Sequence, residues 1–221
     1  VNPAGTALAY CGYIGGADPD IGYGIAVDAA GNAYVTGATA STAATFPVAV
    51  GPQLTHSGDV DAFVAKINPA GTALTYCGYI GGAGLDMGYG IAVDAAGNAY
   101  VTGVTDSAEA TFPVAVGPDL THNGLLDAFV AKVAPAGTAL TYCGYIGGAD
   151  DDTGRGIAVD YAGSAYVTGA TDSAETTFPV AVGPDLTYNG GTDGFVAKVN
   201  PAGTALAYCG YIGGASYDDG W

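Results

Sequence analysis

Short apolar runs separated by turn-forming residues recur along the whole chain. Between residues 88 and 148 these runs read GIAVD (90–94), AYVTG (99–103), DAFVAKV (127–133) and ALTYCGYI (139–146). Runs rich in Val, Ile, Tyr and Thr and bounded by Gly, Pro, Asn or Asp predict β-strands. Between them, Asp94 with Gly97 and Pro135 with Gly137 predict tight turns. Each unit is therefore expected to be a four-stranded antiparallel meander in an all-β protein.

Three of the four runs are apolar on consecutive residues, which is typical of strands covered on both faces of their sheet. Sheets of this kind repeated in tandem predict propeller-type blades packed against one another. The small residues of the first run suit a crowded centre, and the tyrosines of the fourth suit a wider outer edge. The long connection 104–126 contains TFPVAVG. We expect it to pack over the blade edge as a lid; a contact surface or a site for O-linked sugar is the alternative.

The fourth run lies within a motif, NPAGTALTYCGYIGG at 68–82, that occurs four times, each other copy differing from it at one position. Its copies begin at residues 2, 68, 134 and 200, a constant spacing of 66 residues. An internal repeat of this length predicts an array of similar structural units. The predicted units are a partial repeat (1–21), three blades (22–87, 88–153 and 154–221) and, within the third, a terminal loop.

Several motifs in these units resemble a known family. They are GNAYVTG at 31–37 and 97–103, DAFVAK at 61–66 and 127–132, and DxGxGIAVD at 20–28, 86–94 and 152–160. Together with the TFPVAVG segment, they are similar to the bacterial β-propeller repeat called SBBP. The resemblance implies four-stranded blades in secreted or surface proteins and brings no catalytic residues with it. The chain departs from the usual repeat in its YCGYIGG strand, which places a cysteine in every copy.

The motif occurs four times against three copies of everything else, so the strand at 7–14 has no blade of its own. Three explanations stay open: the chain is a window of a longer tandem protein, several chains complete one ring, or the extra strand is donated to the next subunit. An unpartnered strand with exposed apolar residues favours pairing with another copy. The residues expected in such an assembly are Tyr10, Tyr13, Ile14, Tyr208, Tyr211 and Ile212.

The charge balance excludes one class of partner. The chain has four Lys and Arg against 21 Asp and Glu, a net charge of −17. Such a chain repels phosphate backbones, so no nucleic-acid binding is expected. No apolar run is long enough for a spanning helix, and no membrane insertion is expected. The Lys-poor, Gly- and Tyr-rich repeats favour an extracellular or cell-surface location, with surface glycans as further candidate partners.

One cysteine stands at the same position of each motif copy. Neither CxxC nor Cys/His spacing is present, so no zinc, haem or redox centre is predicted. Equivalent cysteines of adjacent sheets, ~10 Å apart, are too distant to bond to one another. They are either small buried thiols or the donors of intermolecular disulfides. The four residues are Cys11, Cys77, Cys143 and Cys209.

Calcium is the one cofactor for which the sequence offers ligands. The GGxxxD loops concentrate carboxylates, and GGAGLD at 81–86 resembles the start of a calcium-binding repeat. Calcium takes 6–8 oxygen ligands, so each loop would need further donors. Solvated aspartates that form turns are the alternative. The candidate ligands are Asp18, Asp20, Asp86, Asp150, Asp152 and Asp218.

Catalysis has little support. Serine is scarce, no GxSxG occurs, and the loop histidines His56 and His122 are replaced by Tyr188 in the third repeat. The recurring Asp61, Asp127 and Asp193 stand directly before a strand, where hydrogen bonding at a hairpin end accounts for them. We therefore predict a non-enzymatic extracellular structural or adhesive protein that self-associates through end strands and cysteines. A lectin-like or calcium-dependent binding module is the alternative.

Overall fold

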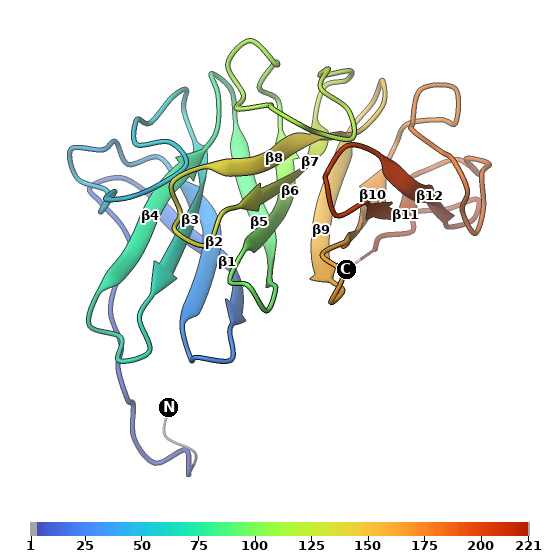
Figure 1. The fold of residues 1–221 in the computed structure, drawn as a ribbon. Coiled ribbons are helices and arrows are strands. Elements are labelled where there is room, and N and C mark those ends of the chain that lie inside the picture. Colours follow the sequence, from blue (N-terminus) through green and yellow to red (C-terminus); the bar gives the residue numbers. More distant parts are fainter. Residues whose placement is uncertain (1–3, 221) are drawn as a thin grey trace.

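The computed structural model describes residues 4–220, which form three four-stranded antiparallel sheets (Figure 1). The strand orders are β1-β2-β3-β4, β5-β6-β7-β8 and β9-β10-β11-β12, so the predicted meander is confirmed in every repeat. In this described range there is no helix, and hence none that is long and apolar enough to cross a membrane. The strands are β1 (Asp20–Val27), β2 (Ala33–Thr39), β3 (Asp61–Ile67), β4 (Leu74–Ile80), β5 (Asp86–Val93), β6 (Ala99–Thr105), β7 (Asp127–Val133), β8 (Leu140–Ile146), β9 (Asp152–Val159), β10 (Ala165–Thr171), β11 (Asp193–Val199) and β12 (Leu206–Ile212).

The innermost strand of each sheet is longer than predicted. β1, β5 and β9 begin at residues 20, 86 and 152, two residues before the predicted blade boundaries. A register shift between Gly88 and Gly90 leaves Tyr89 outside the ladder, and this bulge allows β5 to continue on both sides. The prediction missed the first half of the strand because its DMGYG sequence has no apolar alternation.

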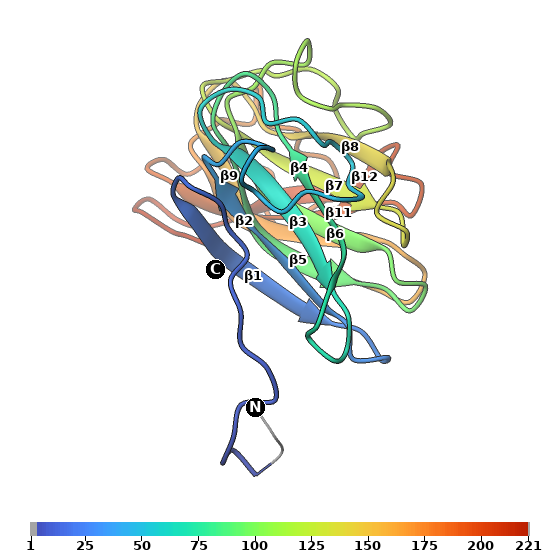
Figure 2. The ribbon, with the colours of Figure 1, turned by 90° about the vertical axis from the view of Figure 1, so that its left-hand side faces the viewer.

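The three sheets stand side by side like the blades of a fan (Figure 1), and from the side of the first sheet the other two lie behind it (Figure 2). The inner strands β1, β5 and β9 are neighbours at the narrow side of the fan. There the backbones approach closely: a Cβ at Gly24 would lie 2.7 Å from the carbonyl oxygen of Tyr89. Small residues on the inner strands therefore serve the crowded centre, as the sequence predicted.

The buried core lies between the sheets. One cluster joins Tyr34, Tyr76 and Ile80 of the first sheet to residues such as Val101 and Val133 of the second. A second cluster joins the second sheet to the third in the same way. Burial of an aliphatic or aromatic side chain stabilises a fold by roughly 1.5–3 kcal/mol, so these inter-sheet contacts dominate the stability of the array.

The long connection forms the lid that we expected. Phe46 is buried, with its ring centroid 5.3 Å from Phe63 and 5.5 Å from Tyr79. The connection also bonds to the outer strand, since Ala49 N–H donates to the Cys77 carbonyl (3.2 Å) and Cys77 N–H donates to the Val50 carbonyl (2.7 Å). The outer edge of each sheet is thereby occupied, which blocks edge-to-edge pairing with another sheet.

Candidate functional site

The sheets do not close into a ring, so the first and third sheets each present one uncovered face. We call the uncovered side of the first sheet the leading face (Ile25, Val27, Val35 and Ile67). We call the uncovered side of the third sheet the trailing face (Tyr166, Val196, Tyr208 and Ile212). Both faces consist of residues that are covered in the middle of the array, which makes them the candidate functional site.

Exposure values show how much these faces differ from their internal equivalents. Ile25 on the leading face is 69% exposed, whereas Ile91, one repeat later, is 8% exposed. Ile212 on the trailing face is 58% exposed, whereas Ile80 and Ile146 are completely buried. Contiguous exposed apolar surface is typical of an interaction site. The same side chains are therefore core residues inside the array and surface residues at its two ends.

The internal interfaces show how a trailing face fits a leading face. The ring of Tyr76 on the first sheet packs directly over Gly137 in a turn of the second, where any Cβ would collide with it. The hydroxyl of Tyr34 donates to Asp28 of its own sheet (3.1 Å) and lies 3.5 Å from the Gly97 carbonyl oxygen of the second sheet. The interface between the second and third sheets repeats both contacts with Tyr142 over Gly203 and the Tyr100 hydroxyl on Gly163.

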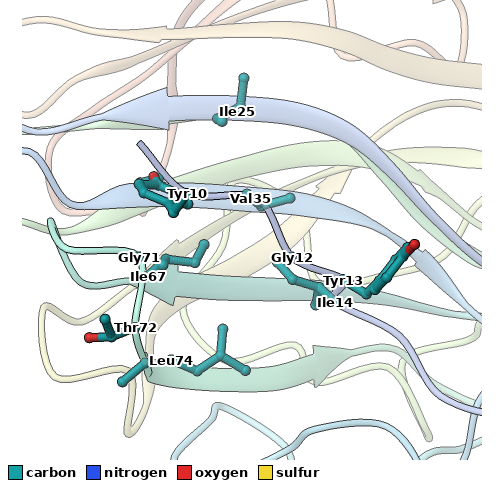
Figure 3. Close-up of a pocket in the computed structure, with 12 residues that line it drawn as sticks. Tyr10, Gly12, Tyr13, Ile14, Ile25, Val35, Ile67, Gly71, Thr72 and Leu74 are labelled. Carbon is teal, nitrogen blue, oxygen red and sulfur yellow. The ribbon is translucent and has the colours of Figure 1, made fainter. Parts of the chain in front are cut away.

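Part of the leading face is covered by the N-terminal segment 8–14. Its Tyr10 ring packs over Gly71, in the same relation as Tyr76 to Gly137. A cavity of about 350 Å³ lies between this segment and the sheet, lined by Tyr10 and Ile14 on one side and by Ile25, Val35 and Ile67 on the other. Figure 3 shows Tyr10 near Val35 and Gly71, with Ile25 on the neighbouring strand β1. One segment thus stands where a complete sheet packs elsewhere in the array.

The predicted assembly residues divide into four groups. Tyr10 and Ile14 contact the leading face, and Tyr208 and Ile212 belong to the trailing face. Tyr13 borders the same cavity, but its side chain is fully exposed. Tyr211 is buried beneath the lid of its own sheet, and its N–H donates to the Asp185 carbonyl oxygen (2.8 Å). The open surface of the third sheet is consequently its face, not the edge of β12.

The four cysteines are free thiols in two different environments. Cys77, Cys143 and Cys209 are completely buried, whereas Cys11 is exposed. Burial raises the pKa of the Cys77 and Cys209 thiols to about 12, so they are neutral at ordinary pH. At Cys77, Cys143 and Cys209 the structure therefore favours the buried thiol over the intermolecular disulfide, because these sulfur atoms have no access to solvent. Only Cys11 is placed for such a bond.

The aspartates proposed as calcium ligands close their own loops. Asp86 accepts hydrogen bonds from Gly82 N–H (2.7 Å), from the Ser107 hydroxyl (2.9 Å) and from the Thr105 hydroxyl. Equivalent bonds run from Gly16 to Asp20, from Gly148 to Asp152 and from Gly214 to Asp218. Asp18 and Asp150 are exposed. Within residues 4–220 no group of three or more His, Cys, Asp or Glu is arranged to hold a metal ion.

A second set of aspartates proves more unusual than the sequence indicated. Asp127 is completely buried, and one carboxylate oxygen accepts Asn123 N–H (2.9 Å) while the other has no partner. The same arrangement occurs at Asp61 and Asp193. Burial raises the pKa of Asp61 and Asp127 to about 7. Hydrogen bonding at a hairpin end, as predicted, accounts for only one of the two oxygens.

The inner bulge residues form a row that sequence reasoning missed. Tyr23 and Tyr89 contact each other edge to face, with ring centroids 5.1 Å apart. The equivalent residue of the third sheet is Arg155, whose guanidinium lies 2.7 Å from Asp219. Each of these residues lies between two glycines of its inner strand, and it differs between repeats while the glycines do not. This GxG pattern is the sequence signal that could have identified the bulge.

Comparison with known proteins agrees with this architecture. The model of the SBBP family, described as a beta-propeller repeat, matches residues 12–42, 78–109 and 144–175. No curated protein matches the chain. Each matched segment begins within a copy of the outer-strand motif and continues through the next β-hairpin, so the second and third segments cross from one sheet into the following one.

Proposed function

The chain carries three SBBP beta-propeller repeats, and on this premise we propose that it is a non-enzymatic structural protein that self-associates head to tail. The trailing face of one copy packs on the leading face of the next. The observation that carries this proposal is the pair of open end faces, which are made of the residues that form the internal sheet-to-sheet interfaces.

The fit between the two faces follows from the repeat. The leading face carries Ile25 where the second sheet carries Ile91, and the trailing face carries Ile212 where the first and second sheets carry Ile80 and Ile146. A trailing face and a leading face therefore have the shape and chemistry of two surfaces that already pack within this chain. Two leading faces have no such precedent, so a heterologous contact is favoured over a two-fold one.

Polar groups at the trailing face also match the internal pattern. Lys198 lies 4.7 Å from the centre of the Tyr166 ring and 3.5 Å from Asp160. Inside the array, Lys66 and Lys132 lie 4.9 Å from the rings of Tyr34 and Tyr100. The contact between a lysine and a tyrosine ring is thus repeated at the trailing face, where the lysine also pairs with Asp160.

A heterologous contact ends in a ring when the rotation closes and in a filament when it does not. Closed propellers have about 4–8 blades. Two copies supply six sheets, so a ring of two is the smallest closed product, and an open filament is the other. We further propose that the assembly is an extracellular or cell-surface structural or adhesive element, supported by the Lys-poor, acidic composition. No specific geometric observation favours the calcium-dependent or lectin-like alternative.

Sedimentation of the purified chain against concentration tests the proposal. Wild-type protein is expected to associate at micromolar concentration, and Ile212→Asp is expected to remain monomeric because a buried unpaired charge opposes the contact. Leu125→Asp is the matched control, since Leu125 is 69% exposed in a loop away from both faces. A wild-type chain that stays monomeric at 100 µM and above, here chosen as about a hundredfold excess over a micromolar Kd, would rule out self-association.

A further inference from the structure

We infer that Gly71 and the leading face around it form a socket for Tyr208 of a second copy, and that the chain's own Tyr10 fills this socket until the second copy displaces it. Segment 8–14 is then a removable cover that sets the concentration at which copies join. The inference rests on the proposed self-association and adds the contact that controls it.

The socket is defined by its two internal counterparts. The turn glycines Gly137 and Gly203 each carry a tyrosine ring of the preceding sheet, Tyr76 and Tyr142 respectively, so close that a Cβ would collide with it. At Gly71 the same position is filled by Tyr10. A tyrosine over this turn is therefore the normal partner of every sheet in the array, and for the first sheet it comes from the chain's own N-terminal segment.

The cover and its competitor have the same sequence. Residues 8–14 and 206–212 both read LAYCGYI. Strand β12 is paired with β11 along its length, whereas segment 8–14 pairs with no strand in the part of the chain that the structure describes. Tyr13 of the segment is 103% exposed, while its equivalents Tyr79, Tyr145 and Tyr211 are completely buried. The segment thus makes the tyrosine contact of an outer strand with few of its other contacts.

A second copy brings contacts that the segment lacks. In the second and third sheets, Gly97 and Gly163 each lie next to a tyrosine hydroxyl of the preceding sheet, which would be 3.4 Å from a Cβ at that glycine. The equivalent Gly31 of the first sheet has no tyrosine beside it, and only Pro69 would lie within 4 Å of a Cβ there. On a docking copy the Tyr166 hydroxyl, which donates to Asp160 of its own sheet (3.0 Å), is placed to pack against Gly31. Val196 and Ile212 of that copy are placed to cover Ile25 and Val27. The second copy therefore buries the leading face more completely than the cover does.

The two occupants exclude each other because Tyr208 and Tyr10 need the same space over Gly71. The C-terminal residues of the docking copy must also move. Gly220 packs against Thr168 in the same way as Gly154, at the start of the third sheet, packs against Thr102 of the second. Residues 218–220 therefore occupy the place on the trailing face that Asp20–Gly22 of the next copy would take. β12 is held by a full strand ladder, so the cover leaves and β12 enters.

The test compares full-length variants by sedimentation velocity over a concentration series. Tyr10→Ala removes the side chain that fills the socket, and it is expected to lower the concentration of half-association by about tenfold or more, the scale of a central interface residue. Tyr13→Ala, in the same segment but fully exposed, is the matched control and is expected to behave as wild type. The double variant Tyr10→Ala/Tyr208→Ala is expected to associate no more tightly than wild type, because the side chain that would enter the socket is missing as well.

Hydrogen exchange of the wild-type protein gives a second measurement. On assembly, exchange in β1 and β2 is expected to fall, while exchange in residues 8–14, whose amides pair with no strand, is expected to stay fast. Two results would refute the proposal that segment 8–14 is a removable cover: Tyr10→Ala associating no more tightly than wild type, or exchange in 8–14 falling on assembly. Either result would leave the proposed self-association intact. If no variant associates at any concentration, the proposed function fails and the socket with it.

Discussion

The carboxyl group of Asp127 offers a quantitative prediction about stability. Replacing Asp127 by Asn keeps the size and the oxygen that accepts Asn123 N–H, and it removes the ionisable group. We predict that Asp127→Asn is more stable than wild type at pH 8, and that at pH 4, where the wild-type carboxyl is protonated, the order reverses and the variant is the less stable of the two.

The sign follows from proton linkage. Burial raises the pKa of Asp127 from 3.8 to about 7 in the folded protein. Between these values the folded state holds a proton that the unfolded state has lost, so the stability of the wild type falls as pH rises from about 4 to 7 and is constant above.

The size follows from the same shift. A difference of about three pH units corresponds to roughly 4 kcal/mol, at about 1.4 kcal/mol per unit. The new amide N–H takes the place of the unpartnered oxygen, and leaving it unpaired costs about 1–3 kcal/mol. We therefore expect Asp127→Asn to gain about 2 kcal/mol over wild type at pH 8.

The assay is urea unfolding followed by circular dichroism at pH 4, 6 and 8. Asp151→Asn is the control, because Asp151 is exposed and the substitution makes the same change in charge. Asp61 and Asp152, whose pKa values burial also raises to about 7, leave a residual pH dependence in Asp127→Asn. A variant that is less stable than wild type at pH 8 would refute the reasoning, since it would mean that the ionised carboxylate is stabilised by a partner.

Three further predictions concern other parts of the molecule. Gly137→Ala is expected to lower stability by about 2–4 kcal/mol, because its φ of 76° is strained for alanine and its Cβ would collide with Tyr76. Gly5→Ala, with a φ of 69° and nothing within 4 Å, is expected to cost only about 1 kcal/mol, and equal losses would contradict this account. A thiol reagent is expected to label Cys11 alone in the folded protein and all four cysteines in urea; rapid labelling of more than one folded thiol would show that the buried cysteines are accessible. Raising the salt concentration from about 0.01 to 1 M is expected to strengthen association, since it shortens the range of repulsion between chains of charge −17 from about 30 to 3 Å; weaker association at high salt would mean that ion pairs hold the contact together.

The sheets and their lids could be predicted from the sequence because their signals are local. Strand β7, at Asp127–Val133, matches the predicted run residue for residue. Turn residues and consecutive apolar positions define a covered strand wherever they occur. The inner strand β5 was predicted too short because a bulge, which has no apolar signature, extends it.

The site could not be predicted as fully because it depends on the neighbours of identical residues. Cys11 and Cys209 stand in the same LAYCGYI sequence, yet one is exposed and the other is buried. Only the second belongs to a paired strand beneath a lid. The unpartnered oxygen of Asp127 likewise results from long-range packing, which local sequence does not encode.

Mixing two singly blocked variants tests head-to-tail association most directly. Ile25→Asp blocks the leading face and leaves the trailing face intact, and Ile212→Asp does the reverse. Each variant alone is expected to sediment as a monomer, and an equimolar mixture is expected to form a 1:1 dimer that grows no further. Association of either variant with itself, or a mixture that remains monomeric while wild type associates, would contradict the account.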